Sequence, residues 1–147
     1  MRFHYSREEI ISLLKQQGHR ITPQRLAIFE LILSSESHPS SDDVYHEIKK
    51  KYPSVSLATI YKNIRLLSDL GLISELNFES QPARYDSNTS PHINVVCPVC
   101  GLIIDHESDL LNQIENLLKK EIGGKSELHL IIVNQICNSC SQKEKTV

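Results

Sequence analysis

The sequence lacks several features that define whole classes of protein. None of its apolar runs approaches the roughly 20 residues that a membrane-spanning helix requires, so we expect no membrane partner. Residues 1–6 lack the apolar core of a signal peptide, and we therefore expect a cytoplasmic protein. With 39% hydrophobic and 23% charged residues, the chain of 147 residues has the composition of a globular protein rather than a disordered or fibrous one.

Motifs of the common enzyme classes are also missing. The sequence contains no G-x-S-x-G nucleophile, no H-E-x-x-H motif and no phosphate-binding loop, and its length leaves little volume for a substrate cleft. We therefore expect that the protein is not an enzyme. A small metal-dependent enzyme and a thiol redox protein remain distant alternatives, because Asp and His residues could surround a metal and the cysteines could exchange thiols.

Charge and metal-binding residue types are distributed unevenly along the chain. Residues 1–84 have a charge balance of +1, whereas residues 85–147 have a balance of −3 and contain all four cysteines and three of the seven histidines. The first stretch is therefore the better partner for a polyanion, and the second is the better place for a metal.

Cap residues predict four helices in the first part of the chain. Each helix is expected to begin after a Ser or Thr that can accept hydrogen bonds from first-turn amides. In the fourth helix, apolar residues recur at helical spacing on one stripe, which we expect to be buried. The caps are Ser6, Thr22, Ser40 or Ser41, and Ser56; the stripe is Leu57, Ile60, Ile64 and Leu67.

An alternating segment follows the fourth helix. Residues 72–79 alternate as a strand does, residues 80–82 form a turn, and residues 83–85 can return as a second strand. Helices followed by a β-hairpin are the order of a winged helix-turn-helix, which we assign to residues 1–85 as the DNA-binding domain. The polar, turn-prone residues 86–91 are expected to form a hinge.

Residues 92–147 are predicted to form a small α/β domain for dimerisation and metal binding. We expect strands at residues 94–96, 102–105 and 128–133, a helix with a wide apolar face at residues 109–121, and a polar tail after the last cysteine. About 60 residues are marginal for an independent core without a metal or a partner chain. The fold class of the whole chain is therefore α+β.

Two cysteine pairs predict a structural zinc site. Cys97 and Cys100 form one C-x-x-C turn, and Cys137 and Cys140 form another. Two such turns supply the four thiolates that Zn²⁺ accepts in a closed tetrahedral shell. Disulfides are not expected without a secretory context, and a thioredoxin-like motif would normally occur once, at the start of a helix.

The remaining candidate ligands lie among sequences that resemble a known family. Residues 18–25 (GHRITPQR), 37–45 (SHPSSDDVY) and 55–65 (VSLATIYKNIR) resemble the DNA-binding half of the ferric uptake regulator (Fur) family. The match continues over nearly the whole chain in the order Arg84-Tyr85-Asp86, His92, C-x-x-C-G, Asp105, C-x-x-C. Aspartates at positions 86 and 105 are most similar to the peroxide-sensing PerR branch.

The resemblance implies a second, regulatory metal site. Its ligands would be His38, Asp86, His92 and Asp105, while Asn94 stands where the PerR branch has a fifth ligand, a histidine. Imidazoles and carboxylates suit Fe²⁺ or Mn²⁺ better than thiolates do. Asn94 either offers its amide oxygen or leaves an open position on the metal.

The function that the resemblance implies is that of a metal-dependent transcriptional repressor. In the PerR branch, bound Fe(II) reacts with hydrogen peroxide and oxidises ligand histidines, here matching His38 and His92. One ion drawing ligands from both domains would set the spacing of two recognition helices in a homodimer. The alternative is an iron-, manganese- or zinc-sensing repressor of the same family without peroxide reactivity; no small-molecule partner beyond metal ions and peroxide is expected.

Double-stranded operator DNA is the expected macromolecular partner. The fourth helix would contact it, and the family resemblance singles out Tyr61 and Arg65. Without the resemblance, Lys62 and Arg65 could equally be a solvated helix face, and Tyr61 could pack in a core. The predicted contacts are Thr59, Tyr61, Lys62, Asn63 and Arg65 of the fourth helix, supported by Arg20 and Arg25.

Overall fold

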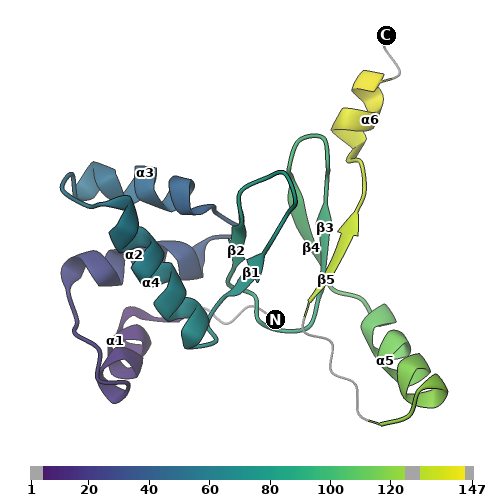
Figure 1. Ribbon diagram of the computed structural model, residues 1–147, viewed down its shortest axis with the longest axis horizontal. Coiled ribbons are helices and arrows are strands. Elements are labelled where there is room, and N and C mark those ends of the chain that lie inside the picture. Colours follow the sequence, from purple (N-terminus) through teal and green to yellow (C-terminus); the bar gives the residue numbers. More distant parts are fainter. Residues whose placement is uncertain (1–4, 125–129, 145–147) are drawn as a thin grey trace. The chain divides into compact units, whose positions relative to one another are not determined.

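The computed structural model describes residues 5–124 and 130–144 of the chain (Figure 1). The fold divides into two compact units, unit 1 (Met1–Thr89) and unit 2 (Ser90–Val147). Within the described residues, every helix is too short or too polar to cross a lipid bilayer.

Unit 1 begins with four helices that start where the cap residues predict. Serine or threonine side chains accept hydrogen bonds from the third helical amide at each N-terminus, and the third helix is capped by Ser40 rather than Ser41. Glycines in the left-handed conformation follow the first and fourth helices. The helices are α1 (Arg7–Gln16), α2 (Pro23–Ser34), α3 (Ser41–Lys51) and α4 (Leu57–Asp69).

The core of unit 1 lies among these four helices. The α4 residues Ile60, Ile64 and Leu67 are buried as predicted, and they belong to the same hydrophobic cluster as Phe29 of α2. The prediction for Leu57 is wrong, because this side chain is 36% exposed. It lies in the first turn of α4, where the neighbouring side chains are also exposed, so the apolar stripe reaches the core one turn later.

A two-stranded hairpin completes unit 1. Strand β1 (Ser74–Leu76) pairs antiparallel with β2 (Arg84–Asp86). Asp86, expected at the start of the hinge, instead ends β2 opposite Ser74, because the hairpin register extends one residue further. An isolated bridge between Ser40 and Arg84 joins β2 to the residues before α3. Helices followed by a hairpin form the predicted winged-helix architecture.

Unit 2 is built on a mixed three-stranded sheet with the order β4-β3-β5. β3 pairs antiparallel with β4 and parallel with β5, and the return from β4 to β5 passes through α5. Residues 128 and 129 of the predicted last strand lie outside the described residues. The elements are β3 (Ile93–Val96), β4 (Ile103–His106), α5 (Leu110–Glu121), β5 (Ile131–Asn134) and α6 (Asn138–Glu144).

Helix α6 replaces the polar tail that the sequence suggested. The carbonyl of Cys137 accepts hydrogen bonds from the amides of Cys140 and Ser141, which is the pattern of a first helical turn. The second cysteine pair therefore lies at the start of a helix rather than at the end of a folded chain.

Candidate metal centres and nucleic-acid interface

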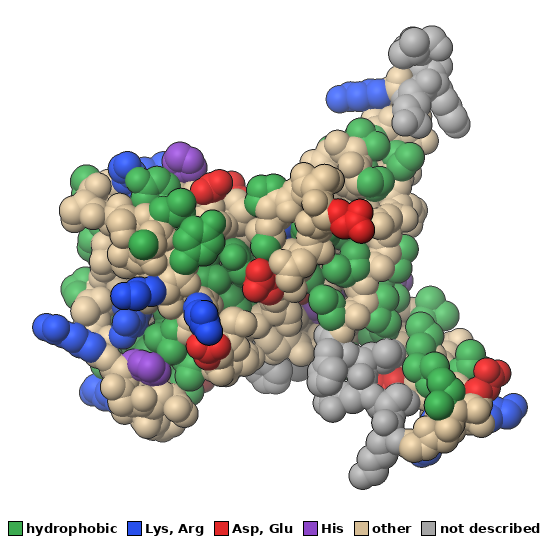
Figure 2. Space-filling model, viewed as in Figure 1, with side chains coloured by type: hydrophobic (Ala, Val, Ile, Leu, Met, Phe, Trp, Pro, Cys, Tyr) green, Lys and Arg blue, Asp and Glu red, His purple; other side chains and the backbone are tan. Residues whose placement is uncertain are grey.

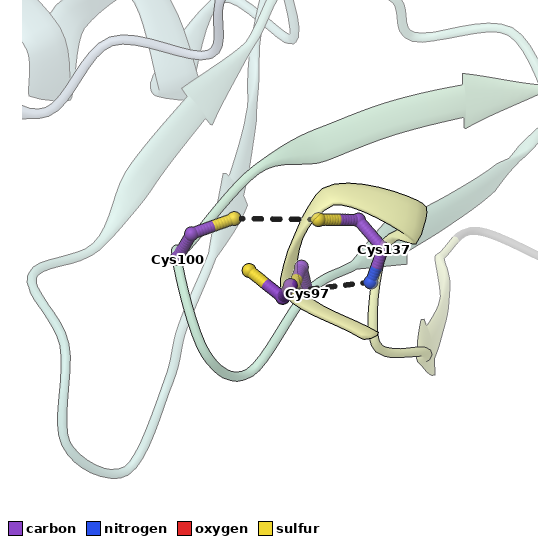
Figure 3. A group of neighbouring side chains, drawn as sticks. Cys97, Cys100 and Cys137 are labelled. Carbon is purple, nitrogen blue, oxygen red and sulfur yellow. Dashed lines mark hydrogen bonds between the residues drawn. The ribbon is translucent and has the colours of Figure 1, made fainter. Parts of the chain in front are cut away.

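The four cysteines form one cluster within unit 2. Cys97 and Cys100 flank the turn between β3 and β4, and Cys137 and Cys140 lie around the start of α6. The four Sγ atoms lie within 4.8 Å of one another, and none of the cysteines is in a disulfide. Figure 3 shows Cys100 reaching across to Cys137, with 3.7 Å between their Sγ atoms.

Backbone hydrogen bonds shape the first cysteine turn. The amide of Gly101 donates to the carbonyl of Cys97, and the amide of Cys97 donates to the carbonyl of Leu102. Gly101 has φ of 72°, a left-handed conformation that glycine adopts without a steric penalty. The amide of Cys137 donates to the Sγ of Cys97 across 3.4 Å (Figure 3). The sequence thus folds locally into a turn that directs both thiols to one point.

The thiols of this cluster differ in their ionisation. Hydrogen bonds from backbone amides, above all that of Cys137, lower the pKa of Cys97 to about 6. The side-chain hydrogen bond with Cys137, together with burial, raises the pKa of Cys140 to about 12. Four thiols packed together cannot all ionise without a cation, because each thiolate opposes the next.

These distances fit a tetrahedral zinc site. With Zn–S bonds of about 2.3 Å, tetrahedral geometry places two sulfurs about 3.8 Å apart. The separation of 3.7 Å between Cys100 and Cys137 agrees with that value. The cluster can therefore hold zinc in a closed, structural site.

A buried His–Asp pair lies within unit 1. His38 is 2% exposed and Asp86 is 1% exposed, and Nε2 of the imidazole lies 3.6 Å from Oδ1 of the carboxylate. This separation is longer than a hydrogen bond. When two ligand atoms each lie about 2.1 Å from one metal ion, tetrahedral to trigonal angles place them roughly 3.4–3.6 Å apart. The separation between Nε2 and Oδ1 is close to that value. Asp86 also accepts the amide of Asn88 at 2.7 Å, which fixes the carboxylate.

The loop that carries His38 is anchored to β2. Among residues 5–124 and 130–144, His38 is the one non-glycine residue with a positive φ, at 50°. Such a conformation costs energy and marks sites held in place by their surroundings. Arg84 donates from Nε to the carbonyl of His38 and from Nη2 to that of Ser37, and the amide of Tyr85 donates to the carbonyl of Pro39.

A second His–Asp pair lies within unit 2. Nε2 of His92 lies 3.7 Å from Oδ1 of Asp105, and Asn94 is directly opposite Asp105 in the β3–β4 ladder. Nδ1 of His92 lies 2.7 Å from the carbonyl oxygen of Ser90, which places the ring proton on Nδ1 and leaves Nε2 with its lone pair. A backbone acceptor on the second ring nitrogen is the usual arrangement for a metal-binding imidazole.

Among the described residues of unit 2, Asn94 is the most completely enclosed polar residue. Its side chain is fully buried, and neither its Oδ1 nor its Nδ2 has a hydrogen-bond partner among the described residues. Burying an amide without such partners is costly.

Helix α4 presents several of the predicted DNA contacts at the surface. Tyr61 is 49% exposed, and Lys62 and Arg65 are exposed. The phenol oxygen of Tyr61 accepts a hydrogen bond from Ser41 at 3.0 Å, so the ring is held at the surface rather than packed in the core. Thr59 is partly buried, and its hydroxyl lies 2.9 Å from that of the cap Ser56.

Asn63, which is also a predicted DNA contact, does not share this exposed face. It is only 5% exposed and lies among the buried residues of α4. Its Nδ2 donates to the carbonyl of Thr59 at 2.8 Å, and its Oδ1 accepts from Nε of Arg25 at 3.0 Å. Nη1 of Arg25 donates to the backbone carbonyl of Arg20, which is an exposed residue. Asn63 lies off the predicted apolar stripe of α4, and its side chain nevertheless turns inward.

Comparison with known proteins identifies the family. The sequence profile of the ferric uptake regulator family matches residues 16–134. The peroxide-responsive repressor PerR of Staphylococcus aureus is 38% identical over 136 residues, which cover 92% of this chain and 92% of that protein. The resemblance found in the sequence motifs is therefore confirmed.

Solved structures agree with this result. The peroxide stress regulator of Campylobacter jejuni has 38% sequence identity and a TM-score of 0.70, covering 90% of this chain and 99% of that one. The Helicobacter pylori ferric uptake regulator Fur, at 23% identity, shares the fold with a TM-score of 0.84 over 96% of this chain and 97% of that one. The enzyme alternative is thereby set aside, and the chain belongs to the ferric uptake regulator family.

Proposed function

We propose that this protein is a metal-dependent repressor that binds operator DNA as a homodimer and releases it when peroxide oxidises its metal site. The observation that carries the proposal is the pair of His–Asp half-sites, one in each unit, each with donors at metal-ligand separations; His38, Asp86 and His92 are buried, and Asp105 is partly exposed. The relative at 38% identity is a peroxide-responsive repressor, which supports the same function here.

The regulatory metal would bind to both half-sites together. Its ligands would be His38 and Asp86 of unit 1 with His92, Asn94 and Asp105 of unit 2. The nitrogen and oxygen donors favour Fe²⁺ or Mn²⁺, whereas the all-sulfur cluster favours the structural Zn²⁺. Asn94 would contribute its amide oxygen, which would give its buried side chain a partner.

Metal binding would control DNA affinity through the two units. We assign DNA binding to residues 1–85, a hinge to residues 86–91, and dimerisation to residues 92–147. An ion that joins the domains would fix the spacing of two recognition helices along the duplex. Metal affinity and DNA affinity would then be coupled reciprocally.

Unit 1 also contains a direct connection from its half-site to the DNA-binding helix. The His38 loop leads into the N-terminus of α3, where buried Ser41 donates its hydrogen bond to Tyr61 of α4. Ser41, whose hydroxyl holds Tyr61, lies only three positions after His38. A change at His38 would therefore act close to the residue that holds Tyr61.

Peroxide would act on the ligand histidines. Bound iron would supply the redox chemistry by which one oxygen atom of hydrogen peroxide is added to an imidazole while the other leaves as water. His38 and His92 are the imidazoles with an Nε2 beside a carboxylate in their half-sites. An oxidised ring is a poorer ligand, so the site would open and the repressor would leave its operator.

The homodimer would form through unit 2. On α5, Leu110 and Leu117 are 50% and 54% exposed, and Figure 2 shows hydrophobic side chains gathered over this helix. On the sheet, Ile104 and Val133 are 52% and 41% exposed. Neighbouring apolar side chains that are each about half exposed are typical of a protein–protein interface. A second copy of the chain would cover them.

The cytoplasm is the compartment that we propose for this protein. Operator DNA is found there, and four cysteines without disulfides suit a reducing environment.

Metal sensing without peroxide reactivity is the second candidate function. Asn94 favours it, because an amide oxygen is a weaker ligand than an imidazole and changes the electronic environment of the metal. In that case iron, manganese or zinc would act as corepressor, and oxidation would not control release.

Electrophoretic mobility shifts distinguish these two functions. The zinc-containing protein is loaded with Fe²⁺ or Mn²⁺ and bound to a duplex selected from a random pool, with and without hydrogen peroxide. We expect both metals to promote binding and peroxide to abolish it only for the iron form. Equal retention of DNA by the peroxide-treated iron form would leave metal sensing as the function.

A further inference from the structure

Arg25 and Asn63 form a polar connection between α2 and α4 that the metal-dependent mechanism does not use. Arg25 lies in the first turn of α2, and Asn63 lies on α4 directly after Lys62. The guanidinium is partly exposed, whereas the amide that accepts its Nε–H is buried. A buried acceptor is therefore joined to a cation at the surface.

The hydrogen bonds leave Arg25 in one orientation. Nε donates to Asn63, and Nη1 donates to the backbone carbonyl of Arg20. Asn63 is itself fixed, because its Nδ2 donates to the carbonyl of Thr59. The planar guanidinium has five N–H donors, so the two protein acceptors leave donors on Nη1 and Nη2 for another ligand.

We propose that Asn63 is a positioning residue that holds the guanidinium of Arg25 against α4, ready to bind a phosphate of the DNA backbone. The same helix carries exposed Lys62 and Arg65, so the held guanidinium extends a cationic surface rather than acting alone. Fixing a long side chain before DNA arrives lowers the entropy lost on binding. Asn63 contributes to affinity without touching DNA.

This inference depends on the proposed DNA-binding function and has its own test. The manganese-loaded protein is titrated against a duplex selected from a random pool, over a range of salt concentrations. The variants are Asn63→Leu, which keeps the branched shape of the side chain and removes the acceptor, Arg25→Ala, and the two combined. Arg7→Ala is the matched control, because it removes an exposed arginine of α1 that pairs with Glu30.

We expect Arg25→Ala to weaken binding about tenfold and Asn63→Leu to weaken it several-fold. Each should lower the slope of log K against log salt by about 0.9, the value for one phosphate contact. The double variant should bind like Arg25→Ala alone, since the amide acts through the arginine. Arg7→Ala should bind like the unmodified protein.

Two outcomes overturn the positioning role. In the first, Asn63→Leu weakens DNA binding equally in the presence and absence of Arg25, which would mean that the amide acts on the fold. In the second, Arg25→Ala leaves the DNA affinity and the salt slope unchanged. If the unmodified metal-loaded protein selects no duplex at all, the proposed DNA-binding function fails instead, before the variants are compared.

A measurement on the unmodified protein covers the case in which Asn63→Leu does not fold. Nitrogen-15 NMR reports how fast each arginine Nε–H exchanges with water. The Nε–H of Arg25 should exchange more slowly than those of Arg20 and Arg65, because it alone of the three donates to a buried side chain in the described structure. Equally fast exchange at Arg25 contradicts the proposal.

Discussion

The two units of this protein obtain their stability in different ways. In unit 1, the four helices and Tyr85 of β2 contribute to one apolar cluster. This cluster includes Phe29 of α2 and the buried stripe of α4. In unit 2, Leu117 of α5 and Ile104 of β4 are about half exposed, and the four thiols lie within 4.8 Å of one another. We therefore expect unit 1 to fold by hydrophobic burial and unit 2 to require a metal and a second copy.

Removal of zinc should produce the largest effect and should separate the two units. Structural zinc sites contribute roughly 10–16 kcal/mol of apparent binding free energy in small peptides. We therefore expect Cys97→Ser to lose zinc and unfold unit 2, while the helices of unit 1 remain. Metal analysis, circular dichroism and limited proteolysis measure this outcome. Retention of a protease-resistant unit 2 without zinc would contradict it.

Substitution of one carboxylate in each half-site tests whether the units share one metal. Asp86→Asn in unit 1 and Asp105→Asn in unit 2 should each lower Mn²⁺ affinity by about 100-fold or more, because each removes an anionic ligand. Calorimetric titration measures the affinity, and zinc content serves as the control. A large loss for only one of the two variants would indicate that the metal belongs to that unit alone.

A charged residue on the exposed face of α5 should break the dimer without affecting unit 1. Leu117→Glu places a carboxylate in an apolar interface and should weaken dimerisation by about 2–4 kcal/mol. Leu57→Glu, at an apolar position of unit 1 that is 36% exposed, is the control. Sedimentation equilibrium should show a dimer for the control and a monomer for the variant at low micromolar concentration. Equal masses for both variants would exclude α5 from the interface.

The smallest predicted effect concerns the cap of α3 in unit 1. The hydrogen bonds of Ser40 hold the pKa of Asp43 below its usual value. A lowered carboxyl pKa stabilises the fold above the unfolded pKa, and this contribution disappears as the pH falls through the folded pKa. Ser40→Ala should therefore cost about 1 kcal/mol at pH 7 and less in acid. Urea denaturation at both pH values measures the difference; an equal loss at both would contradict the role of the carboxylate.

Local signals in the sequence predict much of this fold. Side-chain caps such as Thr22 define the helix starts because their hydrogen bonds involve only the next three residues. Cysteine spacing predicts the thiol cluster, since each C-x-x-C turn brings two sulfurs together within one short segment. The hairpin follows from alternation and turn residues, which are also local.

Long-range contacts account for what the sequence does not predict. Asn63 turns inward because Arg25, 38 residues away, donates to it, and no periodicity encodes that bond. The positive φ of His38 depends on Arg84, which binds the loop from β2. Asp86 belongs to a strand because Ser74 pairs with it. A lone histidine or aspartate in the sequence carries no sign of these partners.

Anomalous diffraction from manganese-loaded crystals tests the shared regulatory metal most directly. Data collected around the manganese absorption edge locate Mn²⁺ separately from zinc. We predict one manganese peak per chain, bonded to Asp86 of unit 1 and to His92 and Asp105 of unit 2, together with a separate zinc peak at the cysteines. Manganese bonded to the residues of a single unit, or found only among the cysteines, would contradict the account.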